Sequence, residues 1–410
     1  MSAGILAGMR VVEGSAFVAA PLGGMTLAQL GAEVIRFDPI GGGLDYRRWP
    51  VTANGDSLFW AGLNKGKRSI AVDLRHPEGR ELLTALVTAP GEDAGIFLTN
   101  FPAHGWLSYE VLAARRADLI MLNVLGSRDG GSAVDYTVNP RVGFPLVTGP
   151  PDTQGPVNHV LPAWDLITGQ MAATGILAAE RHRRRSGQGQ LIKLALLDVA
   201  LAVAGHLGYI AEVQINSGDR ERAGNDLYGA FGRDFPTADG RRVMVVGLTP
   251  RQWQAIGRAT GLVDELAAAA RSARLDFAQE GDRYRGRDAI AALLGPWIAA
   301  RDYADLSAIF DAAGVCWGPY QNFRDLVQTD PECTPDNPLF SEVEQPGIGC
   351  YRMPGTPLDF SAMPRLPASP APLLGADTEY VLGDILGLSS GEIARLVDAG
   401  VVAVPSVPSG

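Results

Sequence analysis

The pattern between residues 9 and 37 constrains the fold more than any other part of the chain. A short apolar run at 9–12 is followed by a turn rich in glycine, alanine and proline, an amphipathic segment at 22–30 and a second apolar run at 33–37. Gly31 is placed to end the helix, because glycine readily adopts the left-handed conformation found after helix C-termini. Strand, helix and strand form a βαβ unit, which predicts a parallel sheet.

Similar alternation continues through the first half of the chain. Further β-like runs occur at 69–72, 95–98 and 119–125, separated by helical patterns such as 77–87. A long helix is predicted at 166–185, and its small residues would let another backbone approach closely: Gly169, Ala172, Ala173 and Gly175. A strand at 191–196 and an apolar helix at 199–211 follow. The first half is therefore predicted to be an α/β domain.

The middle of the chain has a different character. Asp239-Gly240 separates two β-like runs within 233–246, which is a strong signal for a β-hairpin. Helical patterns follow at 250–260, 263–273, 287–300 and 303–313, and the stretch 354–372 is rich in proline and reads as an extended strap. Two short helices are expected at 377–386 and 390–399. We predict a large domain at 1–215, a small domain at 225–328 and a C-terminal strap with helices at 329–410.

Composition narrows the functional classes. The chain has 410 residues and a formal net charge of −10, which disfavours a protein that wraps nucleic acid. Three cysteines without a C-x-x-C pair, and five histidines without an H-x-x-x-H pair, indicate neither a zinc site nor a disulfide framework. No apolar run reaches the ~18 residues that span a bilayer, and the N-terminus lacks secretory features. We expect a cytoplasmic protein with no membrane partner.

The βαβ opening raises the possibility of dinucleotide binding, with Asp38 placed to meet a ribose hydroxyl. The first turn reads GSAFVAAPLGG, however, and lacks the G-x-G-x-x-G glycines that allow a tight turn and close approach to a pyrophosphate. NAD or FAD binding is therefore a minor alternative.

Two basic regions could hold phosphates or carboxylates. The loop NKGKR places Lys65, Lys67 and Arg68 in a glycine-containing turn before a strand. Isolated arginines that could contact a phosphate or a carboxylate are Arg36, Arg47 and Arg48. From the residues alone, each is at least as well explained as an ordinary surface charge.

Asp165 lies between an apolar lead-in, HVLPAW, and the long helix. Aspartate is a preferred N-cap residue, so capping would explain it without any chemistry. The same position suits a nucleophile, because a helix N-terminus favours an ionised carboxylate and can donate N–H groups to a developing oxyanion. The two interpretations are compatible.

Several fragments, taken in order, resemble the family III CoA transferases. They include LAGMRVVEG, LAQLGAEVIRFDP, NKGKRSIAVDL, the Asn100-Phe101 pair, WDLITGQMAATGILAAERHRRRSGQGQ and GVCWGPYQNFRDLVQTDPE. The resemblance covers nearly the whole chain. It implies a Rossmann-like large domain, a smaller inserted α+β domain and an interlocked homodimer that binds an acyl-CoA substrate.

The resemblance also implies roles for individual residues. Asp165 corresponds to the family's nucleophilic aspartate, four residues before Gly169 and ahead of the G-Q-G-Q segment at 187–190. The CoA-binding positions fall on Val18, Ala19, Arg36, Asn64, Lys65, Lys67, Asn100 and Phe101. Val18 stands where formyl-CoA transferase-like members carry glutamine, so a polar role does not transfer to it. Arg47 and Tyr228 are candidate partners for a substrate carboxylate.

Other stretches, such as NHVLPAWD and GNDLYGAFGRDF, resemble the branch that moves CoA between the C1 and C4 carboxyls of mesaconyl-CoA (2-methylfumaryl-CoA). This implies intramolecular transfer through an aspartyl anhydride and an aspartyl-CoA thioester, with no metal and no cofactor beyond the CoA of the substrate. The alternative is intermolecular transfer between an acyl-CoA and a free dicarboxylic acid.

Overall fold

The computed structural model describes residues 4–405, which form two compact units. Within these residues, unit 1 comprises 4–142, 160–214 and 331–405, and unit 2 comprises Gly143–His159 and Ile215–Asp330. The segment Gly143–His159 therefore packs with the middle of the chain, although the sequence analysis assigned it to a first domain at 1–215. Its backbone carbonyls at Pro145, Leu146 and Thr153 accept hydrogen bonds from Arg222.

Unit 1 is built on a seven-stranded sheet with the order β12-β3-β2-β1-β4-β5-β6. Six strands run parallel: β1 (Arg10–Gly14), β2 (Glu33–Asp38), β3 (Arg68–Val72), β4 (Ile96–Thr99), β5 (Ile120–Leu125) and β6 (Gln190–Ala195). The predicted parallel sheet is thus confirmed. The strand order reverses between β1 and β4, as in doubly wound Rossmann-like sheets.

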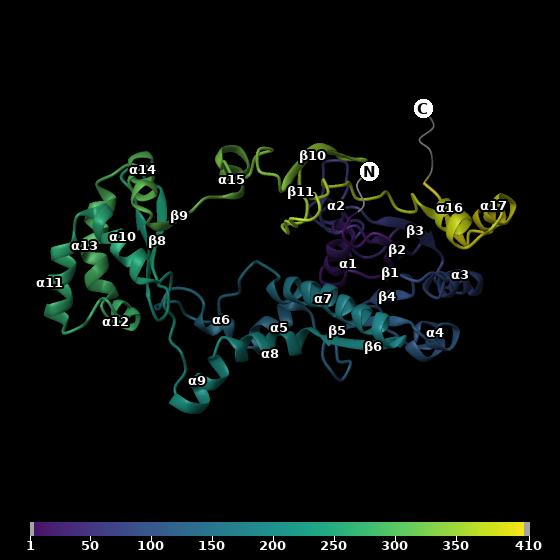
Figure 1. Ribbon diagram of the computed structural model, residues 1–410, viewed down its shortest axis with the longest axis horizontal. Helices are drawn as coiled ribbons and strands as arrows, with labels where there is room; N and C mark the ends of the chain where they lie inside the picture. Colours follow the sequence, from purple (N-terminus) through teal and green to yellow (C-terminus); the bar gives the residue numbers. More distant parts are fainter. Residues whose placement is uncertain (1–3, 406–410) are drawn as a thin grey trace. The chain divides into compact units, whose positions relative to one another are not determined.

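Helices cover both faces of this sheet (Figure 1). Neighbouring residues of β1 point to opposite faces: Val12 packs in a cluster with α3 (Pro77–Val87) and α4 (Tyr109–Arg115), whereas Val11 packs with α1 (Ala19–Gln29) and α7 (Ala163–Ser186). Strands buried on both faces explain why their sequences are almost continuously apolar. The shorter helices of this unit are α2 (Leu58–Leu63), α5 (Asp135–Arg141), α8 (Leu196–His206) and α9 (Tyr209–Asn216).

Helix α7 is longer than the predicted 166–185 and ends where expected, at Gly187 with φ 72°. Figure 1 shows it running alongside β5 and β6. The predicted close approach through its small residues is confirmed, because Gly23 of α1 lies against the carbonyl oxygen of Gly169. This contact brings the N-terminal ends of α1 and α7 together.

The apolar helix predicted at 199–211 is two helices, α8 and α9, separated at Gly208 with φ 83°. Their axes differ by 57°. No single helix within residues 4–405 is both long and apolar enough to cross a membrane, although α8 and α9 meet the length and composition criteria as a bent pair.

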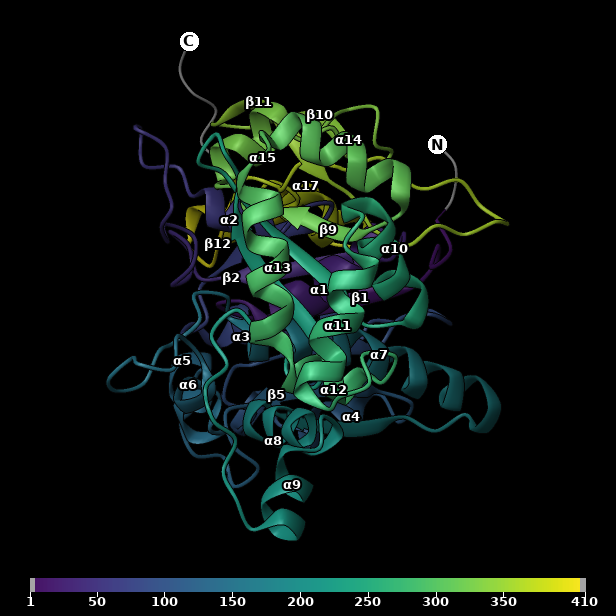
Figure 2. The same cartoon turned by 90° about the vertical axis from the view of Figure 1, so that its left-hand side faces the viewer.

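Unit 2 contains a three-stranded antiparallel sheet, β7 (Phe231–Pro236), β8 (Arg242–Gly247) and β9 (Cys316–Pro319). The predicted hairpin is confirmed, and Gly240 in its turn has φ 80°. Helices α10 (Pro250–Thr260), α11 (Val263–Ala273), α12 (Glu280–Arg285), α13 (Arg287–Ala299) and α14 (Tyr303–Ala313) pack a core with it that includes Phe231, Ile290 and Phe310. Figure 2 shows α11 and α13 side by side. Two short helices, α6 (Phe144–Val147) and α15 (Phe323–Thr329), also belong to unit 2.

The C-terminal segment returns to unit 1. It opens with a hairpin, β10 (Phe340–Gln345) and β11 (Gly349–Pro354), continues in extended form, and ends with α16 (Thr378–Tyr380), a π-helical turn at Val381–Ile385, α17 (Ser390–Asp398) and β12 (Val402–Ala403). The carboxylate of Asp377 binds Arg68 at 2.9 Å and the backbone N–H of Ser69 at 2.9 Å, both on β3. The proline-rich stretch before it packs on unit 1, where the carbonyl of Pro370 accepts from the N–H of Gly66 at 3.0 Å and that of Pro372 accepts from the indole N–H of Trp60 at 3.3 Å.

Candidate active site

A cavity of about 480 Å³ opens in unit 1 at the carboxyl ends of the parallel strands. Its walls come from the loops that follow β1 and β4 and from the ends of β5 and β6, contributing Phe17, Asn100, Gly126 and Leu196. This is the point where the strand order reverses, which is where ligands bind in open α/β sheets. Five residues predicted from the sequence line it together: Val18, Ala19, Asn100, Phe101 and Asp165.

Asp165 lies in the first turn of α7, not at its N-cap position, which is occupied by Pro162. A proline side chain cannot accept a capping hydrogen bond. Asp135, the first residue of α5, performs this role instead: its Oδ2 accepts hydrogen bonds from the backbone N–H groups of Trp164 at 2.8 Å and Asp165 at 3.2 Å. The capping interpretation of Asp165 was therefore wrong, and its carboxyl group is left to face the cavity.

The surroundings of Asp165 disfavour its negative charge. Burial, and to a smaller extent the charge of Asp135, raise the pKa of this carboxyl group to about 7 against the opposing charge of Arg48. We had expected the helix N-terminus to keep the carboxylate fully ionised. Desolvation and a neighbouring acid outweigh the helix dipole here, because the dipole contributes only the equivalent of about half a charge.

Three helices begin at this cavity. Val18 precedes α1, Asp135 begins α5, and Asp165 lies in the first turn of α7. The first N–H groups of a helix have no partner within the helix, and the aligned peptide dipoles place partial positive charge there. Because Asp135 accepts hydrogen bonds from the N–H groups of Trp164 and Asp165 in α7, the backbone donors suited to an oxyanion beside this carboxylate are those at the start of α1.

Arg48 is the only basic side chain lining the cavity within residues 4–405. Its guanidinium lies over two aromatic rings, 5.3 Å from the centroid of Phe17 and 5.2 Å from that of Phe59. The sequence analysis favoured its neighbour Arg47 as the carboxylate partner. Arg47 is exposed and lines a different cavity, beside Asp56 and Gln345, whereas Arg48 lines the cavity that holds Asp165.

Asn100 holds the turn that follows β1. Its Oδ1 accepts a hydrogen bond from the backbone N–H of Ala16 at 2.9 Å, and its Nδ2 donates to the carbonyl of Ala16 at 2.7 Å. The next residue, Phe17, has φ 67°, a left-handed conformation that a residue with a bulky side chain rarely adopts. Asn100 therefore stabilises a strained backbone at the cavity wall.

Three of the predicted CoA-binding residues, Arg36, Asn64 and Lys67, lie instead in a buried polar network. Arg36 is fully buried, pairs with Asp38 at 2.9 Å and Asp45 at 3.0 Å, and donates to Asn64 at 3.1 Å. Lys67 binds Glu13 at 2.8 Å, and burial lowers its pKa to about 8 even though Glu13 raises it. These side chains stabilise the loops after β1 and β2. Their hydrogen-bond donors are already bonded to other groups of the protein.

The remaining two predictions also fall elsewhere. Lys65 is largely buried, its Nζ donates to the carbonyl of Gly62, and desolvation lowers its pKa to about 8. Tyr228 belongs to unit 2, where its ring packs beside Tyr284 with centroids 5.2 Å apart and the guanidinium of Arg220 lies over it at 3.9 Å. Neither side chain is among the described residues that line the cavity around Asp165.

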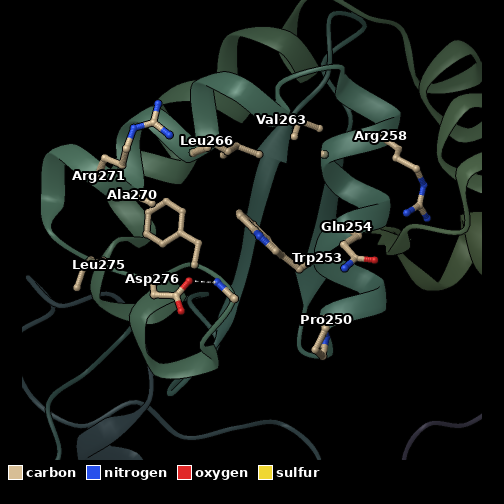
Figure 3. Close-up of a pocket in the computed structure, with 14 residues that line it drawn as sticks. Pro250, Trp253, Gln254, Arg258, Val263, Leu266, Ala270, Arg271, Leu275 and Asp276 are labelled. Carbon is tan, nitrogen blue, oxygen red and sulfur yellow. Dashed lines mark hydrogen bonds between the residues drawn. The ribbon is translucent and has the colours of Figure 1, made fainter.

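Unit 2 has a cavity of its own, of about 610 Å³, between α10 and α11 (Figure 3). Trp253 projects into it, and the walls are mainly apolar, with Leu266, Ala270 and Phe277. None of the residues predicted as site residues is among the described residues that line it. We therefore place the candidate active site in unit 1.

Two residues of the site were missed by sequence reasoning. Asp135 begins α5 in a region with no recognisable motif, and only the fold brings it to the start of α7. Phe17 belongs to the first turn, which lacks the G-x-G-x-x-G pattern, and no sequence signal marks a left-handed backbone at a non-glycine residue.

The fold and the site together define an α/β protein with a half-buried carboxyl group at the switch point of a doubly wound sheet. The model of "CoA-transferase family III" matches residues 6–378. This chain belongs to that family.

Individual relatives match over almost the full chain. A 2-methylfumaryl-CoA isomerase of Chloroflexus aurantiacus is 66% identical over 403 residues, which cover 98% of each chain. A succinyl-CoA:D-citramalate CoA-transferase of the same species is 31% identical, covering 95% of this chain and 96% of the relative. Among solved structures, a CAIB/BAIF family protein from Brucella suis superimposes with a TM-score of 0.75 at 26% identity, covering 94% of this chain and 100% of that one.

Proposed function

We propose that this protein is a 2-methylfumaryl-CoA isomerase that moves CoA between the C1 and C4 carboxyls of one dicarboxylate. The observation that carries the proposal is the half-buried Asp165, with a pKa of about 7, in a cavity that also holds Arg48. The 66% identity to the Chloroflexus aurantiacus enzyme supports this substrate.

The first half of the proposed reaction transfers CoA to the enzyme. A carboxylate oxygen of Asp165 attacks the C1 thioester carbon, the C–S bond breaks, and a mixed anhydride and CoA thiolate form. The thiolate then attacks the carbonyl carbon of Asp165 and breaks the anhydride C–O bond. The enzyme now carries CoA as a thioester on Asp165, and the dicarboxylate is free within the cavity.

The second half repeats these steps at the other carboxyl group. The C4 carboxylate attacks the Asp165 thioester and releases thiolate, giving a new anhydride. Thiolate then attacks C4, so that the C4 thioester forms and the carboxylate of Asp165 is restored. Every step exchanges acyl groups among existing atoms, and we propose that it needs no metal and no cofactor beyond the CoA of the substrate.

The cavity residues have separate roles in this scheme. Backbone N–H groups at the start of α1 would stabilise the oxyanions, and Arg48 would bind the carboxylate that is not reacting. Val18, Ala19, Asn100 and Phe101 would contact the pantetheine end of CoA. An apolar Val18, where related transferases carry glutamine, suits a reaction that positions no second acid from solution.

Retention of the dicarboxylate distinguishes this reaction from its alternative, intermolecular transfer to a free acid. An enclosed intermediate replaces the diffusion of a second substrate by a high effective concentration. We also propose that the protein is a cytoplasmic, interlocked homodimer with a smaller inserted domain, as the family resemblance implies.

Two measurements test the function. Mass analysis after brief incubation with 2-methylfumaryl-CoA is expected to find a CoA adduct on Asp165, and Asp165→Ala is expected to abolish both adduct and turnover. Incubation with labelled free 2-methylfumarate is expected to leave the product unlabelled. Rapid incorporation of label would establish the intermolecular alternative.

A further inference from the structure

Asp135 ties together the starts of two helices at the cavity. Asp135 is only 2% exposed. Its Oδ2 accepts hydrogen bonds from the backbone N–H groups of Trp164 and Asp165. The indole Nε1 of Trp164 in turn donates to Asn139 Oδ1 of α5 at 3.3 Å. Asp165 is thus held in place by a second acid that the proposed reaction steps do not consume.

We propose that Asp135 is a positioning residue for the transfer: its carboxylate fixes the first turn of α7 and supplies the negative charge that favours acylation of Asp165. This inference rests on the proposed function, because it assigns Asp165 the role of nucleophile. An exposed acid would serve as a cap equally well. Because Asp135 is buried, little water screens its charge, and the charge therefore acts strongly on the neighbouring Asp165.

The physical reason lies in the charge that acylation removes. Asp165 begins as an anion and becomes neutral when it forms either the anhydride or the CoA thioester. An interaction that disfavours its anion relative to its neutral acid also favours conversion to a neutral acyl derivative. A carboxylate destabilised in this way is the more reactive nucleophile, as Brønsted behaviour requires.

The charged and titratable groups that face Asp165 come from few elements. Asp135 belongs to α5, Tyr136 follows it at the cavity wall, and Arg48 approaches from the loop between β2 and α2. Helix α1 presents Val18 and Ala19, which do not titrate. Burial has the largest effect on the pKa of Asp165, and Asp135 and Arg48 act on it in opposite directions.

The test separates the charge of Asp135 from its hydrogen bonds. Asp135→Asn keeps an oxygen that can accept from both N–H groups but removes the charge. We expect the acidic limb of kcat/KM, near pH 7 in the unmodified enzyme, to move down by on the order of half a pH unit. We also expect the CoA adduct on Asp165 to form several-fold more slowly above that limb.

Matched variants identify the cause. Glu110→Gln removes an acid from the first turn of α4, on the exposed surface, and is expected to change neither quantity. Asp135→Ser is a second neutral variant with an acceptor oxygen, should Asp135→Asn fail to fold. Asp135→Ala removes charge and cap together and is expected to lower adduct formation further.

The outcomes distinguish this inference from the proposed function. An unmodified enzyme that forms the Asp165 adduct, together with a folded Asp135→Asn or Asp135→Ser variant whose pH profile and adduct rate are unchanged, would overturn the inference alone. Absence of the adduct from the unmodified enzyme, with full turnover by Asp165→Ala, would overturn the proposed function as well.

Discussion

Gly169 of α7 packs directly against the backbone of Ala19 in α1. A Cβ atom at position 169 would lie 2.7 Å from the carbonyl oxygen of Ala19 and 2.9 Å from Cβ of Leu22. Gly169 is one helical turn after Asp165, so this contact sets the distance between the nucleophile and the start of α1. The two helices can approach this closely only because position 169 has no side chain.

Replacement of this glycine should therefore separate the helices. We expect Gly169→Ala to lower the free energy of unfolding by about 2 kcal/mol, as overpacking typically does, and to lower kcat. The matched control is Gly175→Ala in the same helix, where a Cβ would meet only the flexible end of Leu122, at 3.2 Å. Urea unfolding and initial rates measure both effects; equal stability of the two variants would contradict the role of the close contact.

Arg48 and Arg47 offer a neighbouring pair of variants. Arg48→Gln removes the guanidinium from the cavity and should raise KM for the dicarboxylyl-CoA about thirtyfold, which corresponds to about 2 kcal/mol for a charged hydrogen bond. Arg47→Gln changes the same charge at an exposed position outside this cavity and should leave KM unchanged. If Arg47→Gln raised KM and Arg48→Gln did not, the original sequence-based assignment would be restored.

The raised pKa of Asp165 predicts a pH-dependent effect on stability. A group whose pKa is higher in the folded than in the unfolded protein contributes stability below its unfolded value, and loses it as the pH rises through the folded value. For Asp165 this window extends from pH 3.8 to about 7. Asp165→Asn should therefore stabilise the protein by about 4 kcal/mol at pH 8, with little effect near pH 4.

Thermal unfolding of the Asp165→Asn variant at several pH values provides the measurement. Gln170→Ala, at an exposed position of the same helix, controls for changes in helix propensity. A difference in stability that does not vary with pH would show that Asp165 ionises as freely in the folded protein as in the unfolded chain.

Each of the two hydrogen bonds between Asn100 and Ala16 should contribute to the free energy of unfolding. Asn100→Asp retains the acceptor for the N–H of Ala16 and loses the donor to its carbonyl, whereas Asn100→Ala loses both. At about 1 kcal/mol for each bond, we expect Asn100→Ala to be destabilised by about 2 kcal/mol, with Asn100→Asp in between. Chemical denaturation ranks the three proteins, and any other order would contradict the proposed support of the Phe17 turn.

Local patterns in the sequence were sufficient to predict much of the fold. The βαβ opening, the close approach through Gly169 and the Asp239-Gly240 hairpin depend on neighbouring residues, and all three are present. The break at Gly208 was missed, because an apolar run does not distinguish one helix from two.

The site was less accessible to sequence reasoning, for physical reasons. Basic residues are usually exposed, so Arg36 and Lys67 resembled ligand contacts although buried acids neutralise them. Arg47 and Arg48 are adjacent, and only the three-dimensional fold decides which one faces the cavity. The bond between Asp135 and Asp165 joins positions thirty residues apart, and no local pattern reports it.

The return of the C-terminal segment also affects how the chain must be made. Strand β3 pairs on one side with β12, and Arg68 and Asp377 are separated by 309 positions in the sequence. During synthesis, that side of β3 emerges from the ribosome long before its partner exists. An unpaired strand edge can recruit strands from other chains. The nascent protein therefore carries an aggregation-prone edge for most of translation, and closes it only when residues 377–403 have been added.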